Sequence, residues 1–296
     1  KEEVSERIEQ FDPELVGITA MTPTFHGALE AARIAKIHNK KTLIGGVHMS
    51  IYAEETLSYE EVDFGIVGEG EETIVELCSA LEEGRDYNSI QGLCYKLDDG
   101  LIKVSGPRIV MNLTKLPMPS YHLLPMEKYS SIIGMTPVST MMGSRGCPYQ
   151  CGFCYKTPSD KKYRTRSVEN IVDEMESIYD TCNGYYSFSD DVLTLHEKRS
   201  IELCDEILRR GLRVRWSGMT RVDIISEKLI SKLAAAGCHD LYFGVESGSQ
   251  RIRNEVIDKK VDDEEIYDAL QLCKKYRNKI RHEVYVLDKY KDRTKF

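Results

Sequence analysis

From about residue 136 onward, short runs rich in β-branched and aromatic residues alternate with amphipathic helical patterns. This alternation is typical of repeated strand–helix units, which build a parallel sheet covered by helices. The expected strands are 137–142, 185–188, 214–217, 241–245 and 283–287. Because parallel α/β folds place their chemistry at the carboxyl ends of the strands, the residues after each run are the first candidates for a functional site.

The first hundred residues show a similar pattern. Apolar, β-branched runs at 15–21, 42–46 and 64–67 are separated by helical stretches, which predicts a Rossmann-like parallel sheet. Residues 93–104, with Asp98-Asp99-Gly100 at their centre, predict a β-hairpin, and the prolines that follow predict a linker. We therefore expect a first domain over 1–106, a linker over 107–135 and a second domain over 136–296.

The composition narrows the class of protein. A length of 296 residues suits about two domains, and 41% hydrophobic with 30% charged residues is typical of a soluble globular protein. The net charge of -8 argues against a nucleic-acid partner. No apolar run approaches the ~20 residues that span a bilayer, and the charged first residues do not resemble a signal peptide, so we expect no membrane segment and a cytoplasmic location.

Three cysteines stand close together directly after the first strand of the second half. Cys147, Cys151 and Cys154 follow the spacing Cys-x3-Cys-x2-Cys. Thiolates hold iron-sulfur clusters, and a cubane of four irons needs four ligands. Three cysteines therefore leave one iron open to a molecule that is not protein.

A structural zinc site is the alternative for these cysteines, and it would make the protein a metal-stabilised binding module. Zinc needs a fourth ligand and commonly takes two cysteine pairs. The other six cysteines form no second pair and are expected to be ordinary buried thiols: Cys78, Cys94, Cys182, Cys204, Cys238 and Cys273.

The cysteine spacing, with Phe153 just before the last thiol, resembles the signature of radical S-adenosylmethionine (SAM) enzymes. The resemblance implies a 4Fe-4S cluster whose open iron chelates SAM, and an electron from the cluster that cleaves SAM to a 5′-deoxyadenosyl radical. It also implies a small-molecule substrate, a reductant such as flavodoxin or ferredoxin, and a partial TIM barrel of the (βα)6 type. The predicted cluster ligands are Cys147, Cys151 and Cys154.

By position, the strand-end loops correspond to the family's SAM-contacting loops. The predicted SAM contacts are Phe153, Ser189, Asp190, Asp191, Arg221, Glu246 and Ser247. Residues 189–191 would orient the methionine amino group, Arg221 would pair with the carboxylate, and Glu246 would accept hydrogen bonds from the ribose. Two of these assignments have simpler alternatives: Asp190 and Asp191 as caps of the next helix, and Arg221 with Asp223 as a surface ion pair. The basic run Lys156, Lys161, Lys162, Arg164 and Arg166 is expected to be a solvated loop, and steering of an anionic substrate is the alternative.

In the N-terminal half, Gly45-Gly46-Val47-His48 follows the second strand and Gly68-Glu69-Gly70 follows the third. With the surrounding residues, these turns resemble the cobalamin-binding domain that precedes the radical SAM barrel in one large subgroup. The proposed cobalamin contacts are Thr19, Thr22, Gly45, Gly46, His48 and Gly68. The alternative for His48 is a hydrogen-bonded loop histidine. The first strand of such a domain, with its Asp-x-His-x-x-Gly motif, does not occur here, so cobalamin binding and a domain without the corrinoid both stay open.

Taken together, these features predict an α/β protein with a partial Rossmann-like cobalamin-binding-type domain followed by an incomplete radical SAM barrel. In the family the fifth strand leads into a turn resembling Gly-x-Pro-Gly-Glu and a sixth unit, whereas here it leads into 288–296, so we expect an unclosed barrel with an exposed edge strand. The expected outcome of catalysis is cobalamin-assisted methylation, or a cyclisation or rearrangement like that of the anaerobic porphyrin-ester cyclases. A catalytically inactive fragment is the further alternative.

Overall fold

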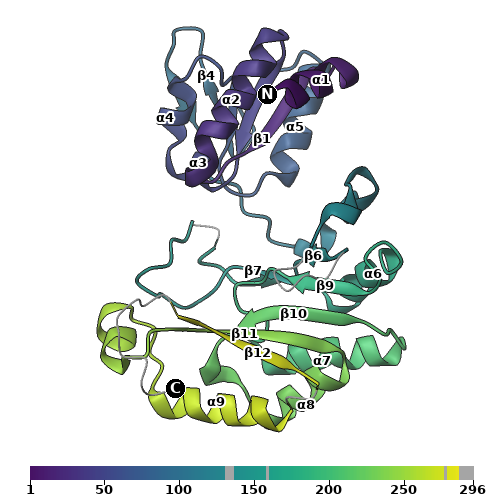
Figure 1. Ribbon diagram of the computed structural model, residues 1–296. Helices are drawn as coiled ribbons and strands as arrows, with labels where there is room; N and C mark the ends of the chain where they lie inside the picture. Colours follow the sequence, from purple (N-terminus) through teal and green to yellow (C-terminus); the bar gives the residue numbers. More distant parts are fainter. Residues whose placement is uncertain (131–136, 158–159, 277–278, 287–296) are drawn as a thin grey trace. The chain divides into compact units, whose positions relative to one another are not determined.

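The computed structural model describes residues 1–130, 137–157, 160–276 and 279–286 (Figure 1). The chain divides into two compact units. The first comprises Lys1–Met111 together with the short stretch at Lys156 and Thr157, and the second comprises the remaining described residues. The predicted domain limits of 1–106, 107–135 and 136–296 stay a prediction.

The first unit is built on a five-stranded sheet in which the strands lie in chain order. The strands are β1 (Leu15–Thr19), β2 (Lys41–Gly45), β3 (Phe64–Ile66), β4 (Leu93–Lys96) and β5 (Ile102–Val104). β1, β2 and β3 are parallel, while β4 and β5 form the expected antiparallel hairpin beside β3. The Rossmann-like sheet predicted from the apolar runs is confirmed, with its first strand ending earlier, at Thr19.

Helices cover both faces of this sheet (Figure 1). They are α1 (Glu2–Phe11), the short 3-10 helix η1 (Thr22–Thr24), α2 (Phe25–Ile37), α3 (Val47–Ile51), α4 (Ala53–Ser58) and α5 (Glu71–Glu82). Leu29 of α2, Met49 of α3 and Leu57 of α4 pack around Ile44 of β2. On the other face, Leu77 of α5 packs in a second cluster. Strands buried on both faces read as continuous apolar runs, which is why β2 and β3 are recognisable in the sequence.

The second unit contains a five-stranded parallel sheet in the order β12-β11-β10-β9-β6. Its strands are β6 (Ser139–Met141), β9 (Tyr185–Phe188), β10 (Arg215–Thr220), β11 (Cys238–Glu246) and β12 (Arg281–Val286). All five expected strands are present. Within the described residues the sheet is open, with β6 and β12 at its two ends.

In the described part of this unit, the α-helices are α6 (Val168–Ser177), α7 (Glu197–Arg209), α8 (Glu227–Ala235) and α9 (Asp263–Lys275). Ser167, Ser226 and Asp262 cap three of them by accepting a hydrogen bond from a backbone N–H of the first turn. Short helices fill the connections: η2 (Leu113–Lys115), η3 (Tyr121–Leu123), η4 (Met126–Lys128), η5 (Val222–Ile224) and η6, a π-helix (Ile252–Val256).

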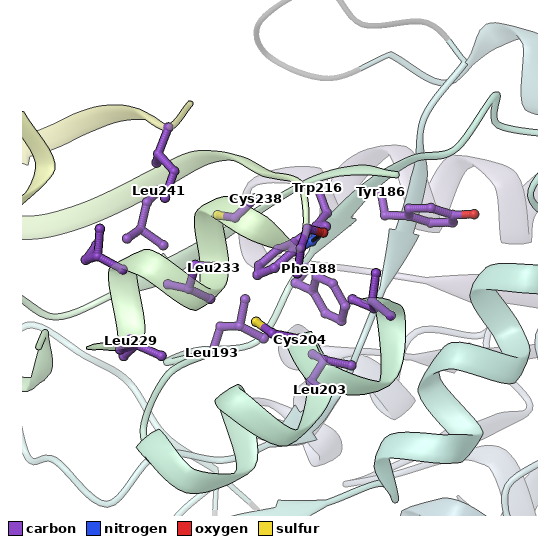
Figure 2. Packing of buried hydrophobic residues seen from close by; sticks show 14 of the residues in the cluster. Tyr186, Phe188, Leu193, Leu203, Cys204, Trp216, Leu229, Leu233, Cys238 and Leu241 are labelled. Atoms are coloured by element: carbon purple, nitrogen blue, oxygen red, sulfur yellow. Dashed lines mark hydrogen bonds between the residues drawn. The ribbon is translucent and has the colours of Figure 1, made fainter. Parts of the chain in front are cut away.

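The core of the second unit lies between the sheet and these helices. In Figure 2, Phe188 and Trp216 extend from neighbouring strands toward the helices and meet edge to face, with ring centroids 5.6 Å apart. Trp216 is the only tryptophan of the chain, and it is fully buried. Its single polar group is hydrogen-bonded, because the indole Nε1 donates to the Ala236 carbonyl at 2.9 Å. Cys204 and Cys238 lie in this core, as predicted for buried thiols.

Some charged side chains are buried at positions where the sequence pattern predicts an apolar helix face or a solvated loop. Glu174 lies within the apolar side of α6 and is 1% exposed, where it pairs with Arg166 and accepts a hydrogen bond from the Tyr121 hydroxyl. Arg164 is buried as well. The expectation that the basic run forms a solvated loop is therefore wrong for Arg164 and Arg166, because these side chains pack into the protein and use their charge internally.

Among the described helices, none is long and apolar enough to cross a membrane.

Candidate functional site

The cysteine loop leaves the sheet at the carboxyl end of β6, as the strand pattern predicts. A short antiparallel pair closes its base: β7 (Ser144–Arg145) precedes the first cysteine and β8 (Arg164–Thr165) follows the last. Inside the loop, Cys147 donates its backbone N–H to the Asp160 carbonyl at 2.9 Å. Cys147 and Cys151 are partly exposed and Cys154 is exposed, so the loop carries its thiols at the surface of the unit.

Two glycines fit the loop against its surroundings. Gly146 has φ +85°, and a Cβ there would lie 2.5 Å from the Lys162 carbonyl oxygen. Gly152 donates its N–H to the Ile257 carbonyl at 2.6 Å, which fastens the middle of the loop to the segment after the π-helix. The loop is thus held from its base and from one side.

The donor set suits an iron-sulfur cluster. Three thiols outside any disulfide stand within one short loop, and thiolate sulfur is the usual ligand of such clusters. Among the described residues, no group of three or more His, Cys, Asp or Glu side chains is arranged to hold a metal ion. The fit of the loop to a cluster rests on the chemistry and the spacing of its three thiols.

Asp190, directly after β9, braces the base of the cysteine loop. Its carboxylate accepts hydrogen bonds from the Gly143 N–H at 2.8 Å and from the Ser144 hydroxyl. Arg199 donates to the Gly143 carbonyl from the same side at 2.9 Å. Asp190 is 1% exposed, and this burial raises the pKa of its carboxyl despite the hydrogen bonds.

The neighbours of Asp190 have other surroundings. Ser189 is exposed and donates its hydroxyl to the Met141 carbonyl at the end of β6, while Asp191 is exposed. Helix α7 begins only at Glu197, so the alternative role of residues 190 and 191 as helix caps is not what the structure shows. Contact of residues 189–191 with SAM stays a prediction.

Arg221 lies just after β10 and is 4% exposed. Its guanidinium forms a two-pronged ion pair with Asp223, with both N···O distances at 2.9 Å. Its Nη1 stands 4.0 Å from the Cys151 sulfur. The surface ion pair considered from the sequence is therefore wrong in one respect, because the pair is buried beside the cysteine loop.

Glu246, at the end of β11, adopts φ +71° and is 7% exposed. Lys259 donates its Nζ to the carboxylate at 2.8 Å and is itself buried. Gly244 leaves the space that this pair occupies, since a Cβ there would collide with the Glu246 carboxylate. Ser247 is fully buried, and its hydroxyl accepts a hydrogen bond from the Ser249 N–H. Lys259 was not predicted as a site residue, because one lysine in a charged loop carries no sequence signal.

Phe153 is half exposed on the cysteine loop, between Gly152 and Cys154.

In the first unit, five of the six proposed cobalamin contacts lie at or just after the carboxyl ends of β1 and β2. His48 is 5% exposed, its ring stacks on Phe25 with centroids 3.9 Å apart, and its Nδ1 lies 3.3 Å from the Thr22 hydroxyl. Burial lowers the pKa of His48. Its Nε2 is buried without a hydrogen-bond partner among the described residues. Thr19 and Gly45 end the two strands, and Gly46 follows at φ +95°.

A cavity of about 460 Å³ opens beside the end of β3 within this unit. Of the six proposed cobalamin contacts, Gly68 lines it, while the other five lie at or just after the ends of β1 and β2. Further lining residues are Ser50, Tyr52, Glu55, Ser105 and Pro107. At φ +80°, Gly68 also approaches the backbone of Arg108 too closely for any side chain, because a Cβ would lie 2.6 Å from its carbonyl oxygen.

Comparisons with known proteins agree with both halves of this arrangement. Residues 1–78 match the B12 binding domain, and residues 141–294 match the Radical SAM superfamily. The fold defines a class of protein in which a Rossmann-like unit precedes, in the sequence, an open parallel α/β sheet with a cysteine loop at its carboxyl edge. The chain belongs to the Radical SAM superfamily.

Two relatives match most of this chain. An uncharacterized methyltransferase of Pyrococcus horikoshii is 37% identical over 280 residues, covering 93% of this chain and 60% of the relative. The anaerobic magnesium-protoporphyrin IX monomethyl ester cyclase of Rubrivivax gelatinosus is 31% identical, covering 93% of this chain and 51% of the cyclase. The chain thus spans 60% or less of the length of these relatives.

Among solved structures, the cobalamin-dependent S-adenosylmethionine radical enzyme OxsB with aqua-cobalamin bound shares the fold, with a TM-score of 0.82 at 21% identity over 96% of this chain and 42% of that chain. The predicted family and fold class are confirmed. The Radical SAM domain implies the 4Fe-4S cluster and SAM, and the B12 binding domain supports cobalamin, so the cofactor predictions are confirmed at the level of the domains.

Proposed function

We propose that this chain forms the cobalamin-binding and radical SAM parts of an enzyme that reductively cleaves SAM to a 5′-deoxyadenosyl radical. The radical serves a cobalamin-assisted methylation or a related carbon-centred transformation. The observation that carries the proposal is the cysteine loop itself: three thiols at the end of β6, on a base braced by the buried Asp190. The cluster supplies the electron and an open iron for SAM, while the protein holds the loop and orients the ligand.

The strand-end residues supply the proposed SAM contacts. Ser189 and Asp191 are exposed, and Ser189 donates to the Met141 carbonyl at the end of β6, which supports their proposed contact with the amino group. Lys259 donates to one carboxylate oxygen of Glu246, which supports the proposal that the second oxygen accepts hydrogen bonds from the ribose hydroxyls. Phe153, Asp190, Arg221 and Ser247 complete the proposed set. For cobalamin, the proposed contacts are Thr19, Thr22, Gly45, Gly46, His48 and Gly68.

Methylation is the outcome we favour. The 37% identical relative is named as an uncharacterized methyltransferase, whereas the cyclase is 31% identical. The substrate is proposed to be a small molecule, with a flavodoxin- or ferredoxin-type reductant and no nucleic-acid partner. We also propose a cytoplasmic location, because all nine cysteines stand outside disulfides, which suits a reducing compartment.

The cluster is tested by anaerobic reconstitution of the full chain with ferrous iron and sulfide. We expect about four irons and four sulfides per chain. Cys151→Ala should lose the cluster, whereas Cys78→Ala, a matched substitution of a partly buried thiol on α5, should keep it. Stoichiometric zinc without sulfide would instead support the metal-stabilised binding module.

The chemistry is tested by incubating the reconstituted chain with SAM and dithionite. 5′-Deoxyadenosine is the expected product, measured by chromatography and mass spectrometry. A fully loaded cluster that yields no 5′-deoxyadenosine would contradict an active enzyme and favour the inactive fragment. Titration with hydroxocobalamin, followed by absorbance and by retention on gel filtration, tests the N-terminal site separately.

A further inference from the structure

The guanidinium of Arg221 is held by three hydrogen bonds within the protein. Its Nε and Nη2 donate to the two oxygens of Asp223, each at 2.9 Å. Nη2 also donates to the Lys259 carbonyl at 2.8 Å. Lys259 in turn forms the buried pair with Glu246, so the segment before α9 is tied to the end of β11. The guanidinium therefore has a fixed position in a nearly water-free environment.

The remaining side of Arg221 faces the cysteine loop. The guanidinium carbon lies 3.8 Å from the centre of the Tyr149 ring, and Nη1 lies 4.0 Å from the Cys151 sulfur. Tyr149 and Cys151 are two residues apart in the loop, so both contacts act on the same short stretch. Counting the described contacts, four of the five N–H groups of Arg221 have an acceptor, which leaves one Nη1 hydrogen for a further ligand.

A fixed positive charge beside a cluster sulfur has two physical consequences. It restrains the direction of the cysteine that bears the sulfur, and it stabilises the extra electron of the reduced cluster. Hydrogen bonds to the sulfurs and nearby charges change the reduction potential of iron-sulfur clusters. The carboxylate of Asp223 opposes the second effect, because it places a negative charge on the far side of the same guanidinium.

We propose that Arg221 is a positioning residue for Cys151 and that Arg221 and Asp223 together set the reduction potential of the cluster, with opposite signs. Arg221 raises the potential by direct contact with the ligand sulfur. Asp223 holds the guanidinium in place and moderates its charge. This inference rests on the proposed cluster at Cys147, Cys151 and Cys154, and it adds a role for Arg221 besides the proposed contact with the SAM carboxylate.

The test is a redox titration of the reconstituted full chain, followed by electron paramagnetic resonance of the reduced cluster. Arg221→Gln removes the charge, so we expect the equilibrium constant for one-electron reduction to fall about tenfold, which is a shift of about 59 mV to lower potential. Asp223→Asn keeps the size of the side chain and removes the opposing charge, so the potential should shift the other way. A purely structural role predicts no such opposite shifts.

Arg210→Gln is the matched control. Arg210 also holds several carboxylates, those of Asp173, Glu176 and Glu206, but it belongs to the helical surface and contacts no loop cysteine. Its potential should equal that of the unmodified chain, and its thermal midpoint shows what the loss of an ion-paired arginine does to the fold. Iron and sulfide are measured for every variant, so that a potential is compared only between fully loaded chains.

Two results would overturn the inference: fully loaded Arg221→Gln and Asp223→Asn variants with unchanged potentials, or shifts of the same sign in both. If Arg221→Gln does not retain four irons, the reduction potentials of Asp223→Asn and Arg221→Lys test the proposal instead. Arg221→Lys keeps the positive charge but lacks the two-pronged fork of the guanidinium. A normal potential in Arg221→Lys with a raised one in Asp223→Asn supports the proposal, and no rise in Asp223→Asn contradicts it. Failure of the unmodified chain to bind four irons removes the proposed function together with this inference.

Discussion

The buried pair of Glu246 and Lys259 offers a measurable test of how the β11 loop is held. Both side chains are below a tenth exposed, and the distance of Lys259 Nζ from Glu246 Oε1 is 2.8 Å. Lys259→Met keeps much of the apolar stem but leaves a carboxylate buried without its cation. Breaking one partner of a buried pair typically costs about 3–5 kcal/mol. We therefore expect Lys259→Met to lower the free energy of unfolding of the second unit by an amount in that range.

The loss should be much smaller when both charges are removed. In Glu246→Gln/Lys259→Met neither charge of this pair remains, and replacement of a whole buried pair is often close to neutral. The double variant should therefore be more stable than Lys259→Met alone. A coupling of this sign is the signature of a direct interaction in a double-mutant cycle.

Trp216 makes the assay specific for the second unit, because it is the single tryptophan and is fully buried in that core. Urea unfolding followed by tryptophan fluorescence gives the free energy of each variant. Lys275→Met is the matched control, since Lys275 pairs with Glu227 on the surface, where both side chains are more than half exposed, and little change is expected. The reasoning is refuted if Lys259→Met costs no more than Lys275→Met, or if the double variant loses the sum of the two single changes.

Three further predictions use the same fluorescence assay or simple chemistry. Cys154 should react with iodoacetamide in the native apo chain, whereas Cys204, whose pKa burial raises to about 12, should react only after unfolding; rapid native labelling of Cys204 would contradict the core assignment. Gly146→Ala should lose bound iron while the fold persists, and Gly211→Ala, at φ +68° but in open space, should keep it, so equal iron losses would count against the loop argument. Burial raises the pKa of Asp190 above 3.8, so this carboxyl contributes stability that is present at lower pH and lost as pH rises through its folded-state pKa. Asp190→Asn should therefore flatten the dependence of the unfolding free energy on pH. An unchanged slope would contradict this sign.

Much of the fold follows from local patterns along the chain. Apolar runs of strand length alternate with helical spacing, so β1–β3 and the five strands of the second unit were predictable within a few residues. The turn Asp98-Asp99-Gly100 specifies the hairpin of β4 and β5. The spacing of three cysteines specifies a metal-binding loop, because it depends only on residues that are neighbours in the sequence.

The hydrogen-bond and ion-pair partners of the polar residues, in contrast, could not be predicted from local patterns in the sequence. Asp190 meets Gly143 and Ser144 more than forty residues earlier, and Arg221 meets Cys151 seventy residues earlier. Strand-end loops are brought together by the order of the parallel strands, and the helices between them separate the partners in the sequence.

Sequence alone thus determined which segments form strands and helices, and which cysteines are predicted to form the ligand set. Tertiary structure decided what each buried charge touches. It turned an expected surface ion pair, Arg221 with Asp223, into a buried contact with a predicted cluster ligand, and it paired Glu246 with a lysine that has no motif around it. The physical reason is that hydrophobic periodicity is read along one element, whereas the partner of a buried charge is set by how the ends of separate elements pack together.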